Sequence, residues 1–187
     1  MKQIRPNSHD AIIEAAFQTF SRDPRASLAD IAERAGVGRA TLHRHFKGRN
    51  DLMVALAQAA MRELDEAVET ATADAQSHTE ALRISLAAII PLADRQWFLA
   101  LEPVNHDPEV KATYQRQLEE LAKAIDAAKA EGGFSRNIPT GWIAQAFDHL
   151  TYAAWESVRA GEATPSQAAS LAWRTLTMGL GAKSDDG

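Results

Sequence analysis

The sequence predicts an all-α fold of about nine helices, in which a three-helix head with a helix-turn-helix precedes a larger helical domain. Three observations support this prediction. Alanine is abundant, and no segment alternates between apolar and polar residues as a half-buried strand would. Proline and glycine divide the chain into segments of helical length. Residues 27–49 have the pattern of two short helices joined by a glycine-containing turn.

The first helix is expected to begin after Asn7, whose side chain can accept a hydrogen bond from a free backbone N–H. The Asp23-Pro24 pair lies beyond its end, because a residue before proline avoids the helical conformation. Apolar residues at helical spacing predict one buried face, made of Ile12, Ile13, Ala16, Phe17 and Phe20.

The first half of the helix-turn-helix carries signals for both of its ends. Ser27 and Asp30 fit a capping box at the start of the helix. Gly36 can adopt the left-handed conformation that ends a helix, and Val37 is the apolar residue expected inside the turn. One buried face is predicted by the i, i+3, i+4, i+7 spacing of Leu28, Ile31, Ala32 and Ala35.

The second helix of the motif presents residues suited to nucleic acid. Gly38 can cap its start, and Leu42 and Phe46 lie four residues apart on an inward face. The side chains left to point elsewhere are small, basic or hydrogen-bonding: Arg39, Ala40, Thr41, His43 and Arg44. Such a set suits base edges and phosphates in a DNA major groove. The segment therefore predicts DNA binding.

The distribution of charge agrees with this prediction. Residues 1–50 contain nine Lys or Arg against five Asp or Glu, whereas the rest of the chain contains 11 against 20. The net charge of −5 therefore combines a basic head with an acidic body. A basic head concentrates the attraction for phosphates at one end of the chain.

Other classes of protein are disfavoured by what the sequence lacks. It has no apolar run of about 18 residues, so no membrane span is expected. Its N-terminus has no apolar signal region, which argues against secretion. The absence of cysteine excludes disulfides and thiol chemistry and fits a reducing interior. We therefore expect a cytoplasmic protein.

Prolines and glycines also divide the body. A long helix over residues 49–73 connects it to the head, and further helices are expected over residues 79–90, 108–131, 140–159 and 165–180. Pro91 should kink or end the first of these further helices. A short aromatic segment covers residues 96–101. The predicted domains are a DNA-binding head of residues 1–48 and a body of residues 49–187.

The head resembles the TetR family of transcriptional regulators over roughly forty positions, through the pairs and triplets Ile31-Ala32, Ala35-Gly36-Val37, Thr41-Leu42 and His45-Phe46. The resemblance implies a homodimer of nine-helix subunits. Helices one to three would bind a palindromic operator in double-stranded DNA, and helices five to seven would surround a pocket for a small apolar or aromatic effector. The last two helices would form a four-helix bundle with the partner. A repressor released by its effector is implied.

By position, the resemblance assigns DNA contacts to Ser27, Arg39, Ala40, Thr41, His43, Arg44, Lys47 and Arg49. Arg39 is the first candidate for a base contact, and Lys47 and Arg49 are candidates for phosphate contacts. Gly38 and Gly48 depart from the family pattern, because both stand where a capping hydroxyl is common. His43 stands where a tyrosine usually packs on the DNA backbone. The alternative is a set of solvated charges on a surface helix.

The body contains candidates for an effector pocket, namely Trp97, Phe98, Leu101, Tyr114, Trp142, Phe147, His149 and Tyr152. Asn105, His106 and Asp148 are polar groups that could orient a ligand. The alternative is a filled core, because large apolar residues at helical spacing usually pack together.

The last two helices contain candidates for the dimer interface, namely Leu150, Ala154, Val158, Ala168, Leu171, Ala172, Thr175 and Leu176. The alternative is packing within one chain. Function requires a dimer, because two recognition helices must reach successive major grooves about 34–36 Å apart.

Two other classes of function were weighed. An enzyme is disfavoured, because only His43 and His45 of the six histidines lie close together, and at i, i+2 on a helix they diverge. No catalytic motif, metal site or cofactor is expected. The other alternative is a helical scaffold or carrier with a vestigial head. The operator, the effector and the choice between repression and activation stay open.

Overall fold

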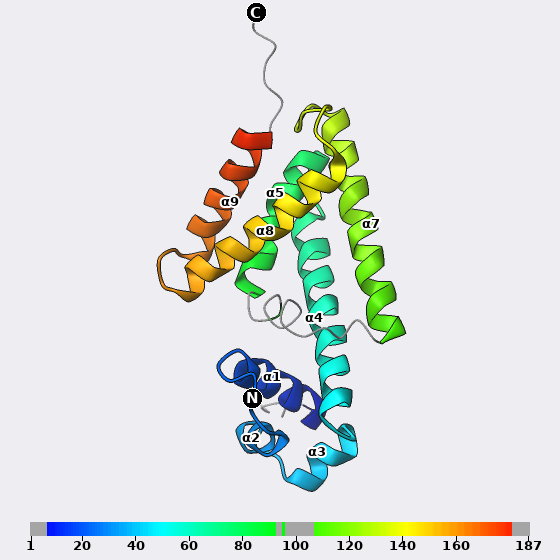
Figure 1. Ribbon diagram of the computed structural model, residues 1–187, viewed down its shortest axis with the longest axis vertical. Helices are drawn as coiled ribbons and strands as arrows, with labels where there is room; N and C mark the ends of the chain where they lie inside the picture. Colours follow the sequence, from blue (N-terminus) through cyan, green and yellow to red (C-terminus); the bar gives the residue numbers. More distant parts are fainter. Residues whose placement is uncertain (1–6, 93–94, 96–106, 181–187) are drawn as a thin grey trace, which may run out of the picture. The chain divides into compact units, whose positions relative to one another are not determined.

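The computed structural model describes residues 7–92, 95 and 107–180, which form eight α-helices and one short 3₁₀ helix (Figure 1). No strand occurs within these residues, so the predicted all-α class is confirmed. None of the helices in this part of the chain has the length and hydropathy that a bilayer crossing requires. The aromatic segment expected at residues 96–101 lies outside the described residues.

The chain divides into two compact units. The first comprises Met1–Arg62 and Asp94–Lys111, and the second comprises Glu63–Ala93 and Ala112–Gly187. The predicted boundary after residue 48 thus falls inside the first unit. The physical reason is that apolar residues near the start of α4 (Arg49–Thr72) join the core of the head, namely Leu52, Met53 and Leu56.

The head of the first unit consists of α1 (Ser8–Phe20), α2 (Leu28–Arg34) and α3 (Arg39–His45). Asn7 caps α1, because its side-chain oxygen accepts a hydrogen bond of 3.1 Å from the backbone N–H of His9. The predicted inward face of α1 is buried in full. Side chains that are at most 1% exposed connect all four helices of this core: Ile12, Phe17, Ile31, Leu42, Leu52 and Leu56. Each contributes about 1.5–3 kcal/mol of transfer free energy.

The second unit contains the rest of α4 together with α5 (His78–Ile89), η1 (Ile90–Leu92), most of α7 (Pro108–Ala130), α8 (Thr140–Arg159) and α9 (Pro165–Leu180). The predicted end of the helix before Pro91 is confirmed, since the chain passes there from α5 into the 3₁₀ turn. A capping box starts α9, because the side chain of Gln167 accepts from the Thr164 backbone N–H at 2.9 Å and the Gln167 backbone N–H donates to the Thr164 hydroxyl at 3.3 Å.

The core of the second unit lies among α5, α8 and α9, which all contact one another. Its members are Leu82, Leu86, Ile143, Phe147, Ala154, Ala168, Ala172 and Leu176. The alanines allow α8 and α9 to approach closely along their whole contact. Phe134 and Trp173 close one side of this core with their rings 6.1 Å apart in a T-shaped arrangement.

Glu131, which follows the last residue of α7, holds the start of α5. Its carboxylate accepts hydrogen bonds from the backbone N–H of His78 at 3.1 Å and of Thr79 at 3.2 Å. It also lies 2.7 Å from Nδ1 of His78. The loop after α7 runs so close to α5 that a Cβ at Gly133 would lie 2.1 Å from the Thr79 hydroxyl oxygen. Glu131 therefore satisfies N–H groups that α5 cannot satisfy by itself.

These bonds make the stability of the second unit depend on pH. The side chain and backbone of His78 lower the pKa of Glu131 to about 2 from its ordinary value of 4.5. A carboxyl group with a lowered pKa stabilises the fold above its unfolded-state value, and loses this effect as the pH falls toward its folded-state value. The contribution of Glu131 is therefore complete above about pH 4.5 and disappears toward pH 2.

We predict that Glu131→Gln lowers the melting temperature at pH 7, and that its difference from the unsubstituted protein shrinks as the pH falls below about 4.5. Thermal unfolding followed by circular dichroism between pH 7 and pH 3 measures this difference. Glu69→Gln is the control, because Glu69 is exposed and makes no hydrogen bond within the described part of the chain. A difference in melting temperature between Glu131→Gln and the unsubstituted protein that stays constant with pH would contradict the stabilising role of the Glu131 carboxylate.

Candidate nucleic-acid interface

Both ends of α2 are set by local hydrogen bonds. The Ser27 backbone N–H donates to Asp30 at 2.8 Å, and the Asp30 backbone N–H donates to the Ser27 hydroxyl at 3.3 Å. At the other end Gly36 has φ +67°, and the Val37 N–H donates to the Ala32 carbonyl at 3.0 Å. This is a Schellman motif, in which glycine avoids the strain of the left-handed conformation. The predicted capping box and the predicted turn are both confirmed.

Ser27 has a structural role besides its predicted DNA contact. Its hydroxyl also donates to the Asp30 carboxylate at 2.8 Å, so its proton is already in use. Hydrogen bonds from the Ser27 backbone and hydroxyl hold the pKa of Asp30 below its ordinary value, and the nearby charge of Arg39 acts in the same direction. Phosphate oxygens only accept hydrogen bonds, so the hydroxyl can donate to a phosphate only by giving up its bond to Asp30.

The helix α3 is anchored by two residues and starts at a glycine. Gly38 is its N-cap in an extended conformation, with no side-chain bond to the helix. Leu42 and Phe46 are 1% and 3% exposed, as their spacing predicted. His45 turns away from His43 and lies with its ring 5.9 Å from that of His9. The two histidines of the helix thus diverge, and only His43 is free of the α1 contact.

The predicted DNA-contact residues share one side of α3. Arg39, Ala40, His43 and Arg44 are exposed. At about 100° per residue they fall within an arc of about 140°. Thr41 lies about 60° outside this arc and is half-buried. The four exposed side chains make no hydrogen bond or ion pair with other described residues. This face is therefore available to a partner, and it presents cationic groups with a small residue among them.

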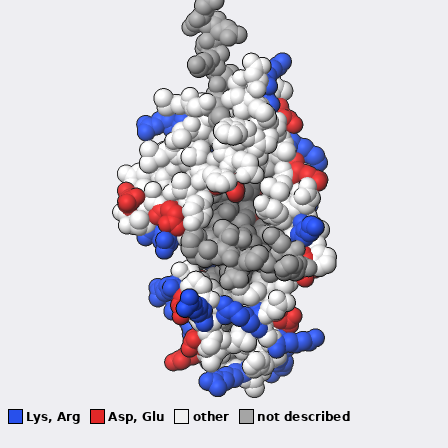
Figure 2. All heavy atoms as spheres, in the orientation of Figure 1, with Lys and Arg blue, Asp and Glu red and all other residues white. Residues whose placement is uncertain are grey.

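The structure brings residues from the starts of α2 and α3 around one open hollow of about 280 Å³. Its lining combines apolar and polar side chains: Ser27, Leu28, Ala29, Arg39, Leu42 and His43. Three of the predicted DNA-contact residues, Ser27, Arg39 and His43, thus share one site. Lys and Arg side chains are prominent over α1–α3 on the face seen in Figure 2.

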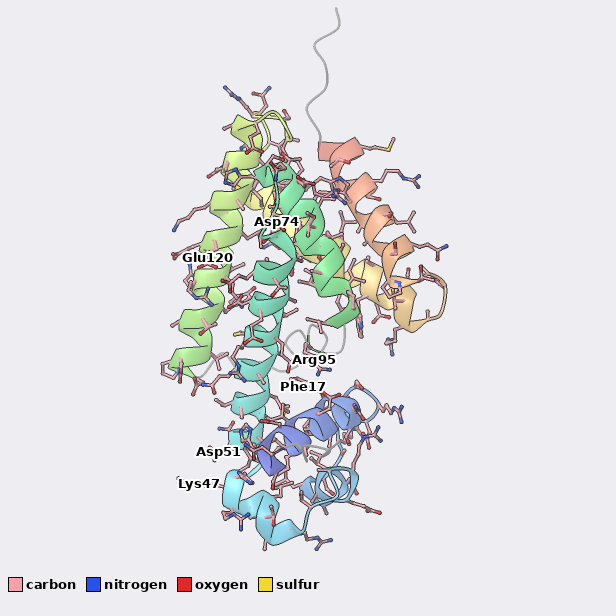
Figure 3. The ribbon with its side chains drawn as sticks, turned by 180° about the vertical axis from the view of Figure 1, so that it is seen from behind. Phe17, Lys47, Asp51, Asp74, Arg95 and Glu120 are labelled. Atoms are coloured by element: carbon pink, nitrogen blue, oxygen red, sulfur yellow. The ribbon has the colours of Figure 1, made fainter. Side chains whose placement is uncertain are left out.

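The corner between α3 and α4 is closed by a residue that sequence reasoning missed. Asp51 accepts a hydrogen bond of 3.1 Å from the backbone N–H of Lys47 (Figure 3). It thereby supplies a cap where Gly48 has no side chain. The signal was present in the sequence, because Asp51 is the third residue of α4, where a carboxylate reaches back to free N–H groups. The side chain of Lys47 stays exposed.

Arg49, for which a phosphate contact is predicted, bonds within the head. Its guanidinium donates to the Pro24 carbonyl and to the Ala26 carbonyl, each at 2.7 Å. The same group lies over the ring of Phe20, 4.6 Å from the centroid. The first residue of α4 is thus bonded to the loop between α1 and α2.

A second arginine of the first unit contacts α1. Arg95 lies 2.5 Å from Glu14 and 4.6 Å from the ring centroid of Phe17, and its side chain is 13% exposed (Figure 3). Glu14 in turn accepts from Gln18 at 2.7 Å, and Gln18 accepts from Arg34 of α2 at 2.7 Å. A continuous set of side-chain bonds therefore runs from Arg95 along α1 to α2.

The predicted pocket residues occupy different environments in the second unit. Trp97, Phe98 and Leu101, with Asn105 and His106, lie outside the described residues. Phe147 is buried, whereas His149 is exposed and its Nδ1 lies 2.8 Å from the Gln145 carbonyl. Three aromatic residues are exposed, namely Trp142 at 66%, Tyr114 at 50% and Tyr152 at 40%. On one chain, these three side chains face solvent instead of lining an enclosed cavity.

The predicted dimer residues divide into two groups. Ala154, Ala168, Ala172 and Leu176 are buried within the chain, where they pack α8 and α9 against each other. Their assignment to a subunit interface is therefore corrected, because buried side chains have no surface to offer a partner. Leu150 and Val158 are half-buried, and Thr175 and Leu171 are exposed. Met178, which the prediction did not include, is 80% exposed and lies one heptad after Leu171.

Within the described residues, no group of three or more His, Asp or Glu side chains could hold a metal ion. The candidate functional side chains that come together in this part of the chain belong to the helix-turn-helix, where Ser27, Arg39 and His43 line one hollow.

Comparisons with known proteins agree with this location. A family model described as "Bacterial regulatory proteins, tetR family" matches residues 12–56. The HTH-type transcriptional repressor LfrR of Mycolicibacterium smegmatis is 32% identical over 158 residues, which cover 84% of this chain and 82% of LfrR. The HTH-type transcriptional regulator NfxB of Pseudomonas aeruginosa is 28% identical over 166 residues, covering 87% of this chain and 89% of NfxB.

The fold is shared as well. The crystal structure of LfrR in complex with proflavine matches this chain with a TM-score of 0.80 and 30% identity, covering 92% of this chain and 96% of that one. The family model and the identity to LfrR along most of both chains show that this DNA-binding regulator belongs to the TetR family of bacterial transcriptional regulators.

Proposed function

We propose that the protein is a repressor that binds a palindromic operator as a homodimer and leaves it when a planar aromatic effector binds. The observation that carries the proposal is the exposed basic face of α3 in the helix-turn-helix. The relative LfrR, whose name describes it as a transcriptional repressor, supports repression. A face of this kind supplies both the phosphate attraction and the base contacts that operator binding needs.

Within this face, Arg39 and Lys47 have different expected roles. Arg39 stands at the first turn of α3 beside the hollow, where a guanidinium can donate two hydrogen bonds to guanine. Lys47 follows the end of α3, and its flexible ammonium group suits a phosphate.

We predict that Arg39→Ala weakens binding to a selected operator by about 1–3 kcal/mol and relaxes the base preference at one position of each half-site. Lys47→Ala should weaken binding to all sequences nearly equally and make the slope of log affinity against log salt concentration shallower by about 1.8, because the dimer loses one phosphate contact in each subunit. Operators are obtained by selection from random DNA, and affinities are measured by fluorescence anisotropy at several salt concentrations. Equal losses for Arg39→Ala on operator and on random duplexes would mean that Arg39 contacts phosphate only.

The homodimer is supported by large apolar side chains left exposed on α8 and α9. They are Trp142, Tyr152, Leu171 and Met178, with exposed fractions from 40% to 80%. Leu171 and Met178 share one face of α9, and Trp142 and Tyr152 belong to the outward side of α8. Since α8 and α9 pack against each other, their outward sides suit a four-helix bundle with a second copy.

We predict that the protein sediments as a dimer at micromolar concentration, and that Trp142→Glu or Met178→Glu converts it to a monomer with an unchanged helical content. Two like charges would meet across a symmetric interface, whereas the fold of one chain loses no buried contact. Leu118→Glu is the matched control, because Leu118 is 37% exposed on α7, outside the proposed interface. A monomeric starting protein, or dimers in both variants, would contradict the proposal.

The effector class is supported by the relation to LfrR, whose structure contains proflavine. Release requires that the effector favour a conformation that binds DNA less well. Arg95 offers one physical route, because its contacts with Glu14 and Phe17 reach α1, and the Gln18–Arg34 bond continues to α2.

We predict that proflavine and operator weaken each other's binding by the same factor, as thermodynamic linkage requires. Fluorescence titration of proflavine with the protein alone and with the protein–operator complex measures the effect of the operator on proflavine affinity. Operator titration with and without proflavine measures the effect of proflavine on operator affinity. Arg95→Gln should bring the factor closer to one. Equal proflavine affinity in both titrations would contradict effector release, whereas no proflavine binding would exclude only this ligand class.

A further inference from the structure

The guanidinium of Arg49 makes three contacts, which reach the α1–α2 loop and the end of α1. The Pro24 and Ala26 carbonyls come from the loop between α1 and α2, and Phe20 is the last residue of α1. Ala26 and Phe20 are each 5% exposed, so the guanidinium covers the edge of the apolar core. One side chain thereby joins the start of α4 to the end of α1 and to the entry into α2.

The chemistry of these contacts requires arginine. A guanidinium is planar and donates from two terminal nitrogens in a fixed geometry while its face lies on an aromatic ring. Here Nη1 donates to residue 26 and Nη2 to residue 24. A lysine has one nitrogen, so it cannot keep both carbonyls at this distance and also stack on Phe20.

The bonded loop leads directly to the DNA-contact site. Ala26 precedes Ser27, which caps α2 and lines the hollow shared with Arg39 and His43. Holding the Ala26 carbonyl therefore sets the position of the start of α2 relative to α3. By contrast, the side chains of Lys47, Arg44 and Arg39 make no hydrogen bond or ion pair with other residues that the structure describes.

We propose that Arg49 is a positioning residue of the helix-turn-helix rather than a phosphate ligand. It fastens the α1–α2 loop to the start of α4 and so orients Ser27 and α2 for DNA binding. The predicted effect of Arg49 on DNA binding rests on the proposed function. The fastening of the loop does not, because its contacts form within the protein in the absence of DNA.

The test compares Arg49→Gln, Arg49→Lys and Lys47→Ala in two measurements. The first is the melting temperature of the full protein without DNA. The second is the slope of log affinity against log salt concentration for a DNA duplex. We expect both Arg49 variants to melt several degrees lower and to bind DNA more weakly by a similar factor at every salt concentration. Lys47→Ala should keep its melting temperature and make the slope shallower by about 1.8, which is about 0.9 for each subunit of the dimer.

A positioning residue and a phosphate ligand predict different salt slopes for Arg49→Gln, because only the loss of a phosphate ligand makes the slope shallower. A phosphate ligand would lose slope, because one cationic contact with DNA is removed. A shallower slope in Arg49→Gln therefore overturns the proposal, whatever its melting temperature, and an unchanged melting temperature in both Arg49 variants overturns it as well. If Arg49→Gln does not fold, Arg49→Lys decides by the melting temperature, because it keeps the charge. If the unsubstituted protein does not bind DNA, the proposed function is contradicted. The melting temperatures of the Arg49 variants then still test whether Arg49 fastens the α1–α2 loop to α4.

Discussion

The DNA-contact face depends on the burial of Leu42 and Phe46 against the other helices of the head. The helix α3 has only seven residues, and an isolated helix of this length is not stable in water. Its helical form therefore comes from tertiary packing, with both side chains at most 3% exposed. Since these two residues fix one side of α3, they also determine which side chains point away from the core. The placement of Arg39, His43 and Arg44 is a consequence of this packing.

Polar contacts at the helix ends then fix how the starts of α2, α4 and α5 are held to their neighbouring segments. Asp30 and Ser27 fasten the start of α2, Asp51 fastens the corner before α4, and Arg49 connects α4 to the loop before α2. Glu131 has the same role for α5 in the second unit. In each case a charged side chain bonds to backbone groups that lack an intrahelical or other partner. The Ser27–Asp30 and Lys47–Asp51 contacts are local, whereas those of Arg49 and Glu131 join segments distant in sequence and so stiffen the arrangement of the helices.

The small-residue stripes of the last two helices have a different role from the predicted one. Alanine-rich faces suit close helix packing whether the neighbouring helix belongs to the same chain or to another one. The structure uses Ala154, Ala168 and Ala172 within the chain. This leaves Trp142, Tyr152, Leu171 and Met178 outside, where exposed large apolar side chains indicate a partner surface. The stripe and the exposed side chains lie on different sides of the same helices, and periodicity alone does not tell which of the two sides meets a neighbour within the chain.

The sequence by itself determined the helices, their ends and the recognition motif. Capping residues, prolines, glycines and the 3.6-residue period act over a few positions, so the ends of α1, α2, α3, α8 and α9 follow from local chemistry. Only the tertiary structure decided what each outward residue touches. Arg49 bonds to the loop at residues 24–26, the alanines of α8 and α9 face inward, and Arg95 meets α1. These contacts join residues far apart along the chain, and a pattern within one helix contains no information about the neighbour across from it.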